Sequence, residues 1–139
     1  MPRTFRLQIV TPDRVILDGP VLSVTAPGVE GQFTVLAGHA PLVAELEIGE
    51  MRYRDEEGDE HPLALHGGFL QVARDRTTVL ADAAERPEDV DLERAQRALE
   101  KAREDQRTLA LRFDEAEIAR IRKQLERAMN RVRIAGKGR

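Results

Sequence analysis

The sequence predicts an N-terminal all-β sandwich, or flattened antiparallel barrel, followed by a C-terminal antiparallel α-helical hairpin. Up to about residue 82, β-rich runs alternate with turn residues at the spacing of about eight to twelve residues that marks sandwiches and barrels. From Pro87 onward, apolar residues recur every three or four positions instead, as one face of a helix requires. We therefore place the β-domain in residues 1–86 and the hairpin in residues 87–139.

The first strand shows the alternation most clearly. Phe5, Leu7 and Ile9 alternate with the polar Arg6 and Gln8, which predicts one apolar and one solvated face. The acidic, glycine-containing run DEEGDEHP predicts a surface hairpin loop. No helical segment separates the runs, so we expect many short antiparallel strands and disfavour a parallel sheet. The other strands are predicted at residues 22–26, 32–36, 42–45, 51–54, 63–66, 69–73 and 77–81.

Two helices are predicted beyond Pro87. Asp91 is placed to cap the first helix, and Asp114 with Glu117 resembles a capping box for the second. Their apolar stripes fit an antiparallel hairpin, but the frequent alanines predict a thin seam that is only marginally stable alone. The stripes are Leu92, Ala95, Leu99, Ala102, Gln106 and Leu109, then Ile118, Ile121, Leu125, Ala128, Val132 and Ala135.

Charge is divided unevenly along the chain, although the net charge is only −3. Residues 1–86 hold 8 Lys/Arg and 14 Asp/Glu, whereas residues 87–139 hold 14 and 11. From Ile118 onward, eight basic residues face a single acid, Glu126. This asymmetry is compatible with a solvated helix face and with binding to an acidic surface.

Composition and motifs argue against an enzyme. The chain has no cysteine, no apolar run near the roughly 20 residues of a membrane span, and no signal-peptide core. We expect a soluble cytoplasmic protein.

The three histidines, His39, His61 and His66, lack a metal-binding spacing, and Ser23, the one serine, does not lie in a nucleophile elbow. A phosphate-binding loop motif is also missing from the sequence. We therefore expect no active site and no metal.

Three blocks of sequence resemble one family in the same order. They are GVEGQFTVLAGHAPL at residues 28–42, LALHGGFLQVARDRTTVLADAAER at residues 63–86 and RAMNRVRIA at residues 127–135. Together they resemble the epsilon subunit of bacterial F-type ATP synthases. The resemblance implies a non-catalytic central-stalk subunit of the proton-translocating enzyme, with the gamma subunit, the c-ring and the alpha and beta subunits as partners. It also implies peripheral association with the cytoplasmic face of the bacterial plasma membrane, through the complex only.

The resemblance implies a rotor contact at one edge of the sandwich. The implied c-ring contact residues are Glu30, Gly31, Gln32, His39 and Pro41. Many relatives carry a glutamate where this chain has Gln32, so a charged contact becomes a neutral hydrogen bond. Alternatively, the glycines and proline only satisfy special backbone angles, and His39 only caps a turn.

A nucleotide site is implied in the helical part. The run VDLERA looks like the family's motif Ile/Leu-Asp-x-x-Arg-Ala, which is associated with ATP as a regulatory ligand in some bacteria. Lys101 replaces a family arginine and cannot make its bidentate contacts. The alternative is a helix cap with exposed charges. The implied ATP-binding residues are Glu85, Val90, Asp91, Arg94, Ala95, Arg127 and Arg131.

The basic second helix is implied to inhibit ATP hydrolysis by contacting acidic segments of the alpha and beta subunits. The residues of this inhibitory face are Arg120, Arg122, Lys123, Arg127 and Arg131. Two alternatives remain: a nucleic-acid-binding module that uses the basic helix, and a free-standing ATP sensor. An acidic β-domain and a basic segment without aromatic residues for base stacking argue against nucleic acid.

Overall fold

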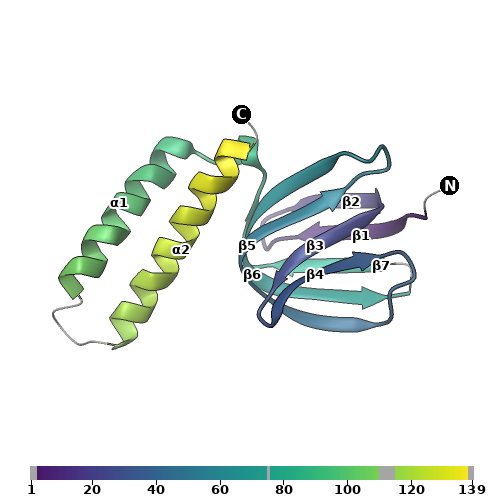
Figure 1. Cartoon of the computed structure of the whole chain (residues 1–139), viewed down its shortest axis with the longest axis horizontal. Coiled ribbons are helices and arrows are strands. Elements are labelled where there is room, and N and C mark those ends of the chain that lie inside the picture. The colour runs from purple at the N-terminus through teal and green to yellow at the C-terminus, as the bar shows by residue number, and fades with distance from the viewer. Residues whose placement is uncertain (1–2, 75, 110–114, 138–139) are drawn as a thin grey trace. The chain divides into compact units, whose positions relative to one another are not determined.

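A computed structural model describes residues 3–74, 76–109 and 115–137. The chain divides into two compact units, residues 1–85 and residues 86–139 (Figure 1). The first unit contains the strands, and the second contains a short 3₁₀ turn and the two α-helices. The predicted fold class, a β-sandwich followed by an α-helical hairpin, is confirmed.

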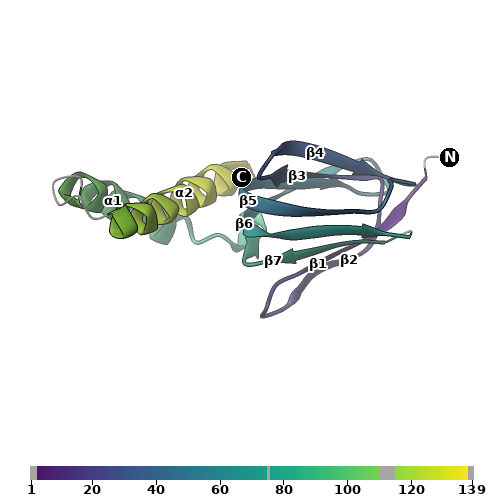
Figure 2. The same cartoon turned by 90° about the horizontal axis from the view of Figure 1, so that it is seen from below.

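The strands of the first unit form one eight-stranded sheet that folds into two layers (Figure 2). The order along the sheet is β2-β1-β7-β6-β5-β3-β4, and β8 pairs with β6. The long strands β5 and β6 are paired along nearly their whole length. The strands are β1 (Phe5–Val10), β2 (Val15–Val21), β3 (Ser23–Gly28), β4 (Gly31–Leu36), β5 (Leu42–Arg54), β6 (Glu60–Ala73), β7 (Arg76–Ala81) and β8 (Ala84–Glu85).

Two adjacent glycines let β6 change partners halfway along. Before Gly67 the strand pairs with β8, and from Gly68 onward it pairs with β7. Gly67 and Gly68 have φ angles of +87° and +134°, a region that other residues rarely adopt. A Cβ on Gly68 would also lie 2.8 Å from Cα of Ala81. Glycine is therefore required at both positions for β6 to change its pairing partner from β8 to β7.

Aliphatic side chains fill the interior of the sandwich. Phe5, Leu7 and Ile9 are buried, while Arg6 is exposed, as the alternation in β1 predicts. Burying a side chain of this size stabilises the fold by about 1.5–3 kcal/mol relative to leaving it exposed. The same cluster includes Val21, Val24, Val35, Met51, Leu63, Leu65, Leu70 and Val79.

The structure corrects three details of the predicted sheet. The strand β2 was not predicted, because its Asp-Gly-Pro sequence resembles a turn; at the sheet edge, proline is tolerated. The runs at residues 42–45 and 51–54 belong to one strand, β5, and those at 63–66 and 69–73 belong to β6. The sheet is also not wholly antiparallel, because β1 and β7 pair in parallel.

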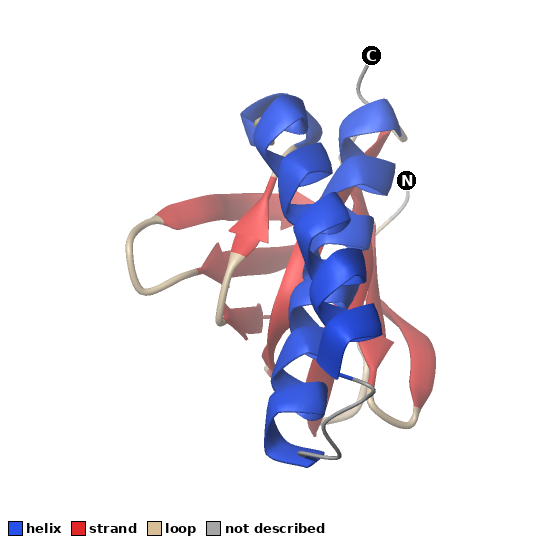
Figure 3. Ribbon diagram, turned by 90° about the vertical axis from the view of Figure 1, so that its left-hand side faces the viewer, coloured by secondary structure: helices blue, strands red, loops and turns tan. Residues whose placement is uncertain are grey.

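In the second unit, a 3₁₀ turn (Pro87–Asp89) precedes the helices α1 (Leu92–Leu109) and α2 (Glu115–Lys137), which lie antiparallel (Figure 3). Asp91 caps α1 as predicted: its Oδ1 accepts a hydrogen bond of 3.1 Å from the backbone N–H of Arg94. The predicted capping residue Asp114 lies outside the described residues, so only Glu117 of that pair falls within α2.

The seam between the helices is thin, as the alanine-rich stripes predict. The buried residues of the two stripes are Ala95 and Ala102 in α1 and Ile121, Ala128 and Ala135 in α2. Gln106, which we predicted to join the stripe, is exposed, because its amide gains more from water than from an apolar seam. The side chain of Leu109 is outside the described residues. The remaining stripe residues are half-buried: Leu92, Leu99, Ile118, Leu125 and Val132.

Candidate functional site

A groove lies at one edge of the sandwich, between the β3–β4 turn and the beginning of β5. Gly28 pairs with Gly31, so Val29 and Glu30 form a two-residue turn. Gly31 has a φ of +125°, and a Cβ on Gly28 would lie 2.7 Å from the carbonyl oxygen of Gly31. Such a tight turn requires glycine at both positions.

The structure gathers four of the five predicted ring-contact residues around this groove, which we call the rim groove. Glu30, Gly31, Gln32 and His39 line it, and Pro41 lies in the loop between His39 and β5. The rim groove has a volume of about 530 Å³. Its full lining is Gly28, Val29, Glu30, Gly31, Gln32, Phe33, His39, Leu42, Val43, Ala44 and Glu45.

Local contacts fix the corner that carries His39. The backbone N–H of His39 donates to the carbonyl of Leu36 at 3.2 Å, and its Nδ1 lies 2.6 Å from the carbonyl oxygen of Ala40. A carbonyl oxygen can only accept, so Nδ1 is the donor in this contact. Gly38 has a φ of +80°, and the guanidinium of Arg3 lies against it. Two hydrogen bonds thus hold the corner, and His39 is exposed to solvent.

A second surface was missed by the sequence reasoning. On the outer face of the sheet, Val15, Val10, Leu80 and Phe69 occupy one continuous row, because each is paired in register with the next. Val15, Leu80 and Phe69 are 56%, 55% and 52% exposed. We call these four residues the outer-face row. The sequence did contain a signal for this row. The runs at residues 69–73 and 77–81 carry apolar residues at both odd and even positions, so apolar side chains point to both faces of the sheet.

The outer-face row is large enough to matter for binding. It crosses four neighbouring strands, and at about 4.8 Å per strand the row spans roughly 14 Å from Val15 to Phe69. Val43, which is 69% exposed, lies on the adjacent strand β5, two residues from Glu45, which pairs with Phe69. Contiguous exposed apolar side chains of this kind are typical of protein–protein contact surfaces.

Some of the predicted ATP-binding residues in the helical unit have structural roles, and the others are arginines that are exposed or line a groove. Val90 and Ala95 are buried in a small cluster with Ala135, and Asp91 caps α1, so all three have structural roles. Arg94 is exposed at the start of α1. Glu85 belongs to the other unit, where its Oε1 lies 3.4 Å from Nε2 of His66.

Arg127 and Arg131 do come together. They line a shallow groove of about 290 Å³ between the helices, which we call the hairpin groove. Lys101, on α1, lines it too and so brings a third cation to the same place. Small side chains form the floor, because alanines occupy the facing positions of both helices. The other lining residues are Ala98, Ala102, Gln124 and Ala128.

The predicted inhibitory residues lie along α2 with Arg120, Arg122, Lys123 and Arg127 exposed and Arg131 half-buried. Arg133, which lies on the same helix, donates a hydrogen bond of 2.8 Å to Oδ1 of the buried Asn130. The basic residues of α2 thus offer several exposed guanidinium and ammonium groups over the length of one helix.

Sequence reasoning did not predict the burial of His66, which is only 2% exposed. Its ring nitrogens make no hydrogen bond with described atoms, and Oε1 of Glu85 lies 3.4 Å from Nε2. Among the described residues, no group of three His, Asp or Glu side chains could hold a metal ion. Neither described helix is long and apolar enough to cross a bilayer.

Comparison with known proteins identifies the family. The profile described as "ATP synthase, Delta/Epsilon chain, beta-sandwich domain" matches residues 4–87. The ATP synthase epsilon chain of Carboxydothermus hydrogenoformans is 52% identical over 104 residues, which cover 75% of this chain and 77% of that protein. The epsilon chain of Nitratidesulfovibrio vulgaris is 40% identical over 136 residues, 98% of each protein. A chain in the structure of the Euglena gracilis mitochondrial ATP synthase, described as OSCP/F1/c-ring in rotational state 1, matches with a TM-score of 0.79 at 29% identity, over 94% of this chain and 80% of that chain. The resemblance seen in the sequence is thereby confirmed, and the chain belongs to the ATP synthase epsilon-chain family.

Proposed function

We propose that this protein is a non-catalytic central-stalk subunit of a proton-translocating F-type ATP synthase. In this role it couples rotation of the rotor to ATP synthesis and inhibits ATP hydrolysis through its C-terminal helices. The observation that carries the proposal is the near full-length match to epsilon chains, with 98% of both chains aligned in one case. Association with the cytoplasmic face of the bacterial membrane would then occur through the complex.

The sandwich has two surfaces suited to transmitting torque. The rim groove collects four of the five residues expected to meet the c-ring, on a glycine turn and a hydrogen-bonded corner. The outer-face row offers an apolar surface for the gamma subunit. A rigid sandwich held at two places by two rotor parts would move with both, and this requires no chemistry by the subunit itself.

The helical hairpin is suited to regulation. Four of the five buried stripe residues are alanines, which bury little area per layer, so we expect the hairpin to have little stability of its own. Its second helix exposes Arg120, Arg122 and Lys123, which acidic segments of the alpha and beta subunits would attract. A weakly held basic helix that moves between resting and inhibitory positions fits these properties.

Binding of ATP as a regulatory ligand is a second proposal, supported by the hairpin groove. Lys101, Arg127 and Arg131 bring three cations to one groove, and arginine forks match phosphate oxygens well. If ATP binds there, the melting temperature of the isolated protein rises with ATP concentration, and Arg127→Ala removes the shift. Lys101→Arg should strengthen binding, because it restores a bidentate donor. Arg103→Ala, an exposed substitution on α1 outside the groove, is the control.

Co-purification from membranes tests the main proposal. A tagged copy of the full chain should bring down the alpha, beta and gamma subunits together with the c-ring. Recovery of the tagged protein without these subunits contradicts the proposal. Salt-sensitive retention on DNA in the same preparation would favour the nucleic-acid-binding class, and ATP-dependent stabilisation without partners would favour a free-standing sensor.

A further inference from the structure

The three lysines of this chain differ in their surroundings. They are Lys101, Lys123 and Lys137, and all three are exposed. Of these, Lys101 is the one that lines the hairpin groove. It lies on α1, whereas the other two cations of the groove, Arg127 and Arg131, lie on the antiparallel helix α2 (Figure 3). A primary amine therefore lies across the groove from two guanidinium groups.

The two arginines are spaced to bind one phosphate group. Residues four apart on a helix lie on the same face, with Cβ atoms about 5–6 Å from each other. Each guanidinium is planar and can donate two parallel hydrogen bonds to phosphate oxygens. The floor between the helices is low, because it includes the buried Ala102 and Ala128. No aspartate or glutamate is among the residues that line the groove, so its lining offers an anion donors and no repelling carboxylate.

Lys101 adds a chemical property that the arginines lack. The neutral amine of a lysine is a nucleophile, whereas an arginine guanidinium stays protonated in proteins. A compound that joins a phosphate to an electrophilic carbon is an acyl phosphate, the mixed anhydride of a carboxylic acid and phosphoric acid. With its phosphate on the arginines, its carbonyl carbon would be held near the amine, and such positioning raises the effective concentration of the two reacting groups. The same guanidinium groups would stabilise the negative charge of the departing phosphate.

We propose that Lys101 is a site of acylation by acyl phosphates, with Arg127 and Arg131 binding the phosphate group. The lone pair of the neutral amine attacks the carbonyl carbon, a C–N bond forms, and the C–O bond to the phosphate breaks. Inorganic phosphate leaves with that electron pair and takes the proton that the nitrogen loses. The product is a neutral amide, so the groove keeps two of its three cations. The inference goes beyond the proposed function, because it requires only that the groove bind phosphate oxygens.

Incubation of the full chain with acetyl phosphate tests the proposal. Peptide mass spectrometry measures the initial rate of acetylation at each lysine, with Lys123 and Lys137 as internal references outside the groove. The uncharged reagent N-succinimidyl acetate, which has no phosphate, reports the intrinsic reactivity of the same amines. The ratio of the Lys101 rate to the reference rates should be about tenfold higher with acetyl phosphate than with N-succinimidyl acetate. Added inorganic phosphate should lower the ratio for acetyl phosphate, because it competes for the two arginines.

Variants separate binding by the groove from a general effect of charge. Arg127→Ala combined with Arg131→Ala should reduce the acetyl phosphate ratio to the value found with N-succinimidyl acetate. Arg103→Ala combined with Arg107→Ala removes two exposed arginines of α1 outside the groove, so this matched control should keep the high ratio. Circular dichroism checks that both variants keep their helices, and the phosphate competition gives the answer without any substitution.

Two results would overturn the inference. One is an equal ratio with both reagents in the unmodified protein, and the other is a high ratio that inorganic phosphate does not lower. Either result would leave the central-stalk function standing, because co-purification from membranes tests that function independently.

Discussion

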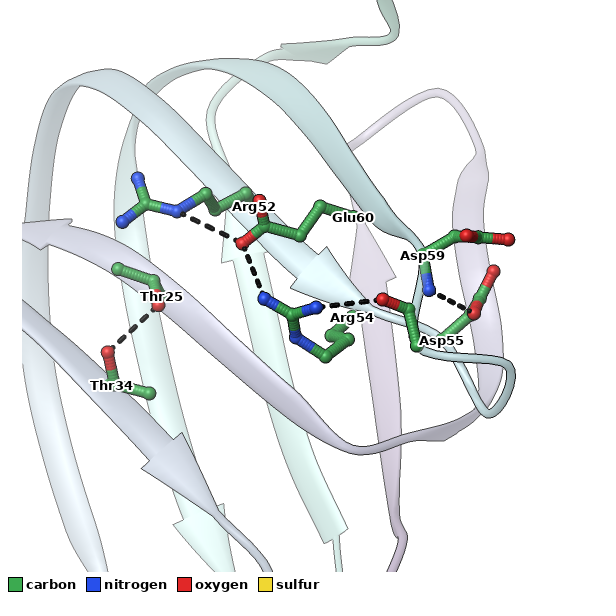
Figure 4. Close-up of polar contacts among 8 residues, drawn as sticks. Thr25, Thr34, Arg52, Arg54, Asp55, Asp59 and Glu60 are labelled. Carbon is green, nitrogen blue, oxygen red and sulfur yellow. Dashed lines mark hydrogen bonds and ion pairs between the residues drawn. The ribbon is translucent and has the colours of Figure 1, made fainter.

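Nε2 of His61 lies 2.7 Å from Oδ2 of Asp55, so a histidine at the start of β6 is tied to the first residue of the β5–β6 hairpin loop. The His61 ring also stacks on Tyr53, with ring centroids 4.8 Å apart. Oδ1 of Asp55 accepts backbone N–H bonds from Glu57 and Asp59, the latter drawn in Figure 4. A single carboxylate thus organises the acidic loop predicted from the sequence.

These contacts make the stability of the sandwich depend on pH. The hydrogen bond from His61 lowers the pKa of Asp55 below its ordinary value, and the backbone N–H groups of Asp59 and Glu57 act in the same direction. A depressed carboxyl pKa contributes stability above the unfolded-state pKa of about 3.9, and this stability is lost as pH falls through the folded-state value. Asp55→Asn should therefore lower the urea midpoint at pH 6 and match the unmodified protein near pH 2.

Tyr53 fluorescence can follow this unfolding, because it is the only tyrosine and the chain has no tryptophan. Glu57→Gln is the matched control: it lies in the same loop, and only its backbone contacts Asp55. The pH dependence would not come from the Asp55 carboxylate if Asp55→Asn and the unmodified protein differed in stability by the same amount at both pH values.

Gly68 gives the second prediction. Gly68→Ala should destabilise the sandwich by about 3 kcal/mol or more, because the new Cβ would meet backbone atoms of Leu80 and Ala81 at a positive φ. Gly19→Ala is the control, since nothing lies within 4 Å of a Cβ there and no positive φ is required. It should change the free energy of unfolding by less than about 1 kcal/mol. Similar losses for both variants in urea unfolding would contradict this account of the strand exchange.

The sequence predicted the fold class because its two periodicities are local properties. The alternation in β1 and the three-to-four spacing of α1 and α2 each arise within a few residues. The parallel pairing of β1 with β7 is different, because it joins segments some seventy residues apart, and no local pattern encodes which strands become neighbours. For the same reason the outer-face row became visible only when the register placed Val10 beside Leu80.

The candidate sites were predictable to different degrees. The family resemblance placed Glu30 and His39 at one edge of the sandwich, and both line the rim groove. The burial of His66 beside Glu85 was not predictable, because an isolated histidine in a strand gives no sign of its surroundings. The convergence of Lys101 with Arg127 likewise depends on how α1 and α2 are aligned, which the stripes do not specify.

The outer-face row supplies the third prediction. Phe69→Lys combined with Leu80→Lys should weaken binding of the full chain to purified gamma subunit by about tenfold or more, because it places two charges in an apolar contact. Both side chains are more than half exposed, so the melting temperature should change little. Leu36→Lys is the control, being equally exposed and apolar but on β4, outside the row. Unchanged affinity in the double variant, measured by biolayer interferometry, would assign gamma binding to another surface.

The last prediction concerns inhibition by α2. Alanine at Arg120, Arg122, Lys123 and Arg127 together, or deletion of residues 114–139, should raise ATP hydrolysis by the assembled complex while leaving assembly intact. Each exposed contact is expected to contribute about 1 kcal/mol or less and to be screened by salt, so the effect should grow with the number of charges removed.

Alanine at Arg97, Arg103 and Arg107, three exposed arginines of α1, is the matched control for lost positive charge and should have little effect on the hydrolysis rate. High salt should raise hydrolysis by the unmodified complex towards the rate of the α2 variant, because it weakens the same contacts. Hydrolysis rates of all these complexes, measured together at low and high salt, separate a specific inhibitory helix from a general effect of charge. Rates that stay equal after the deletion at both salts would mean that α2 does not inhibit this enzyme.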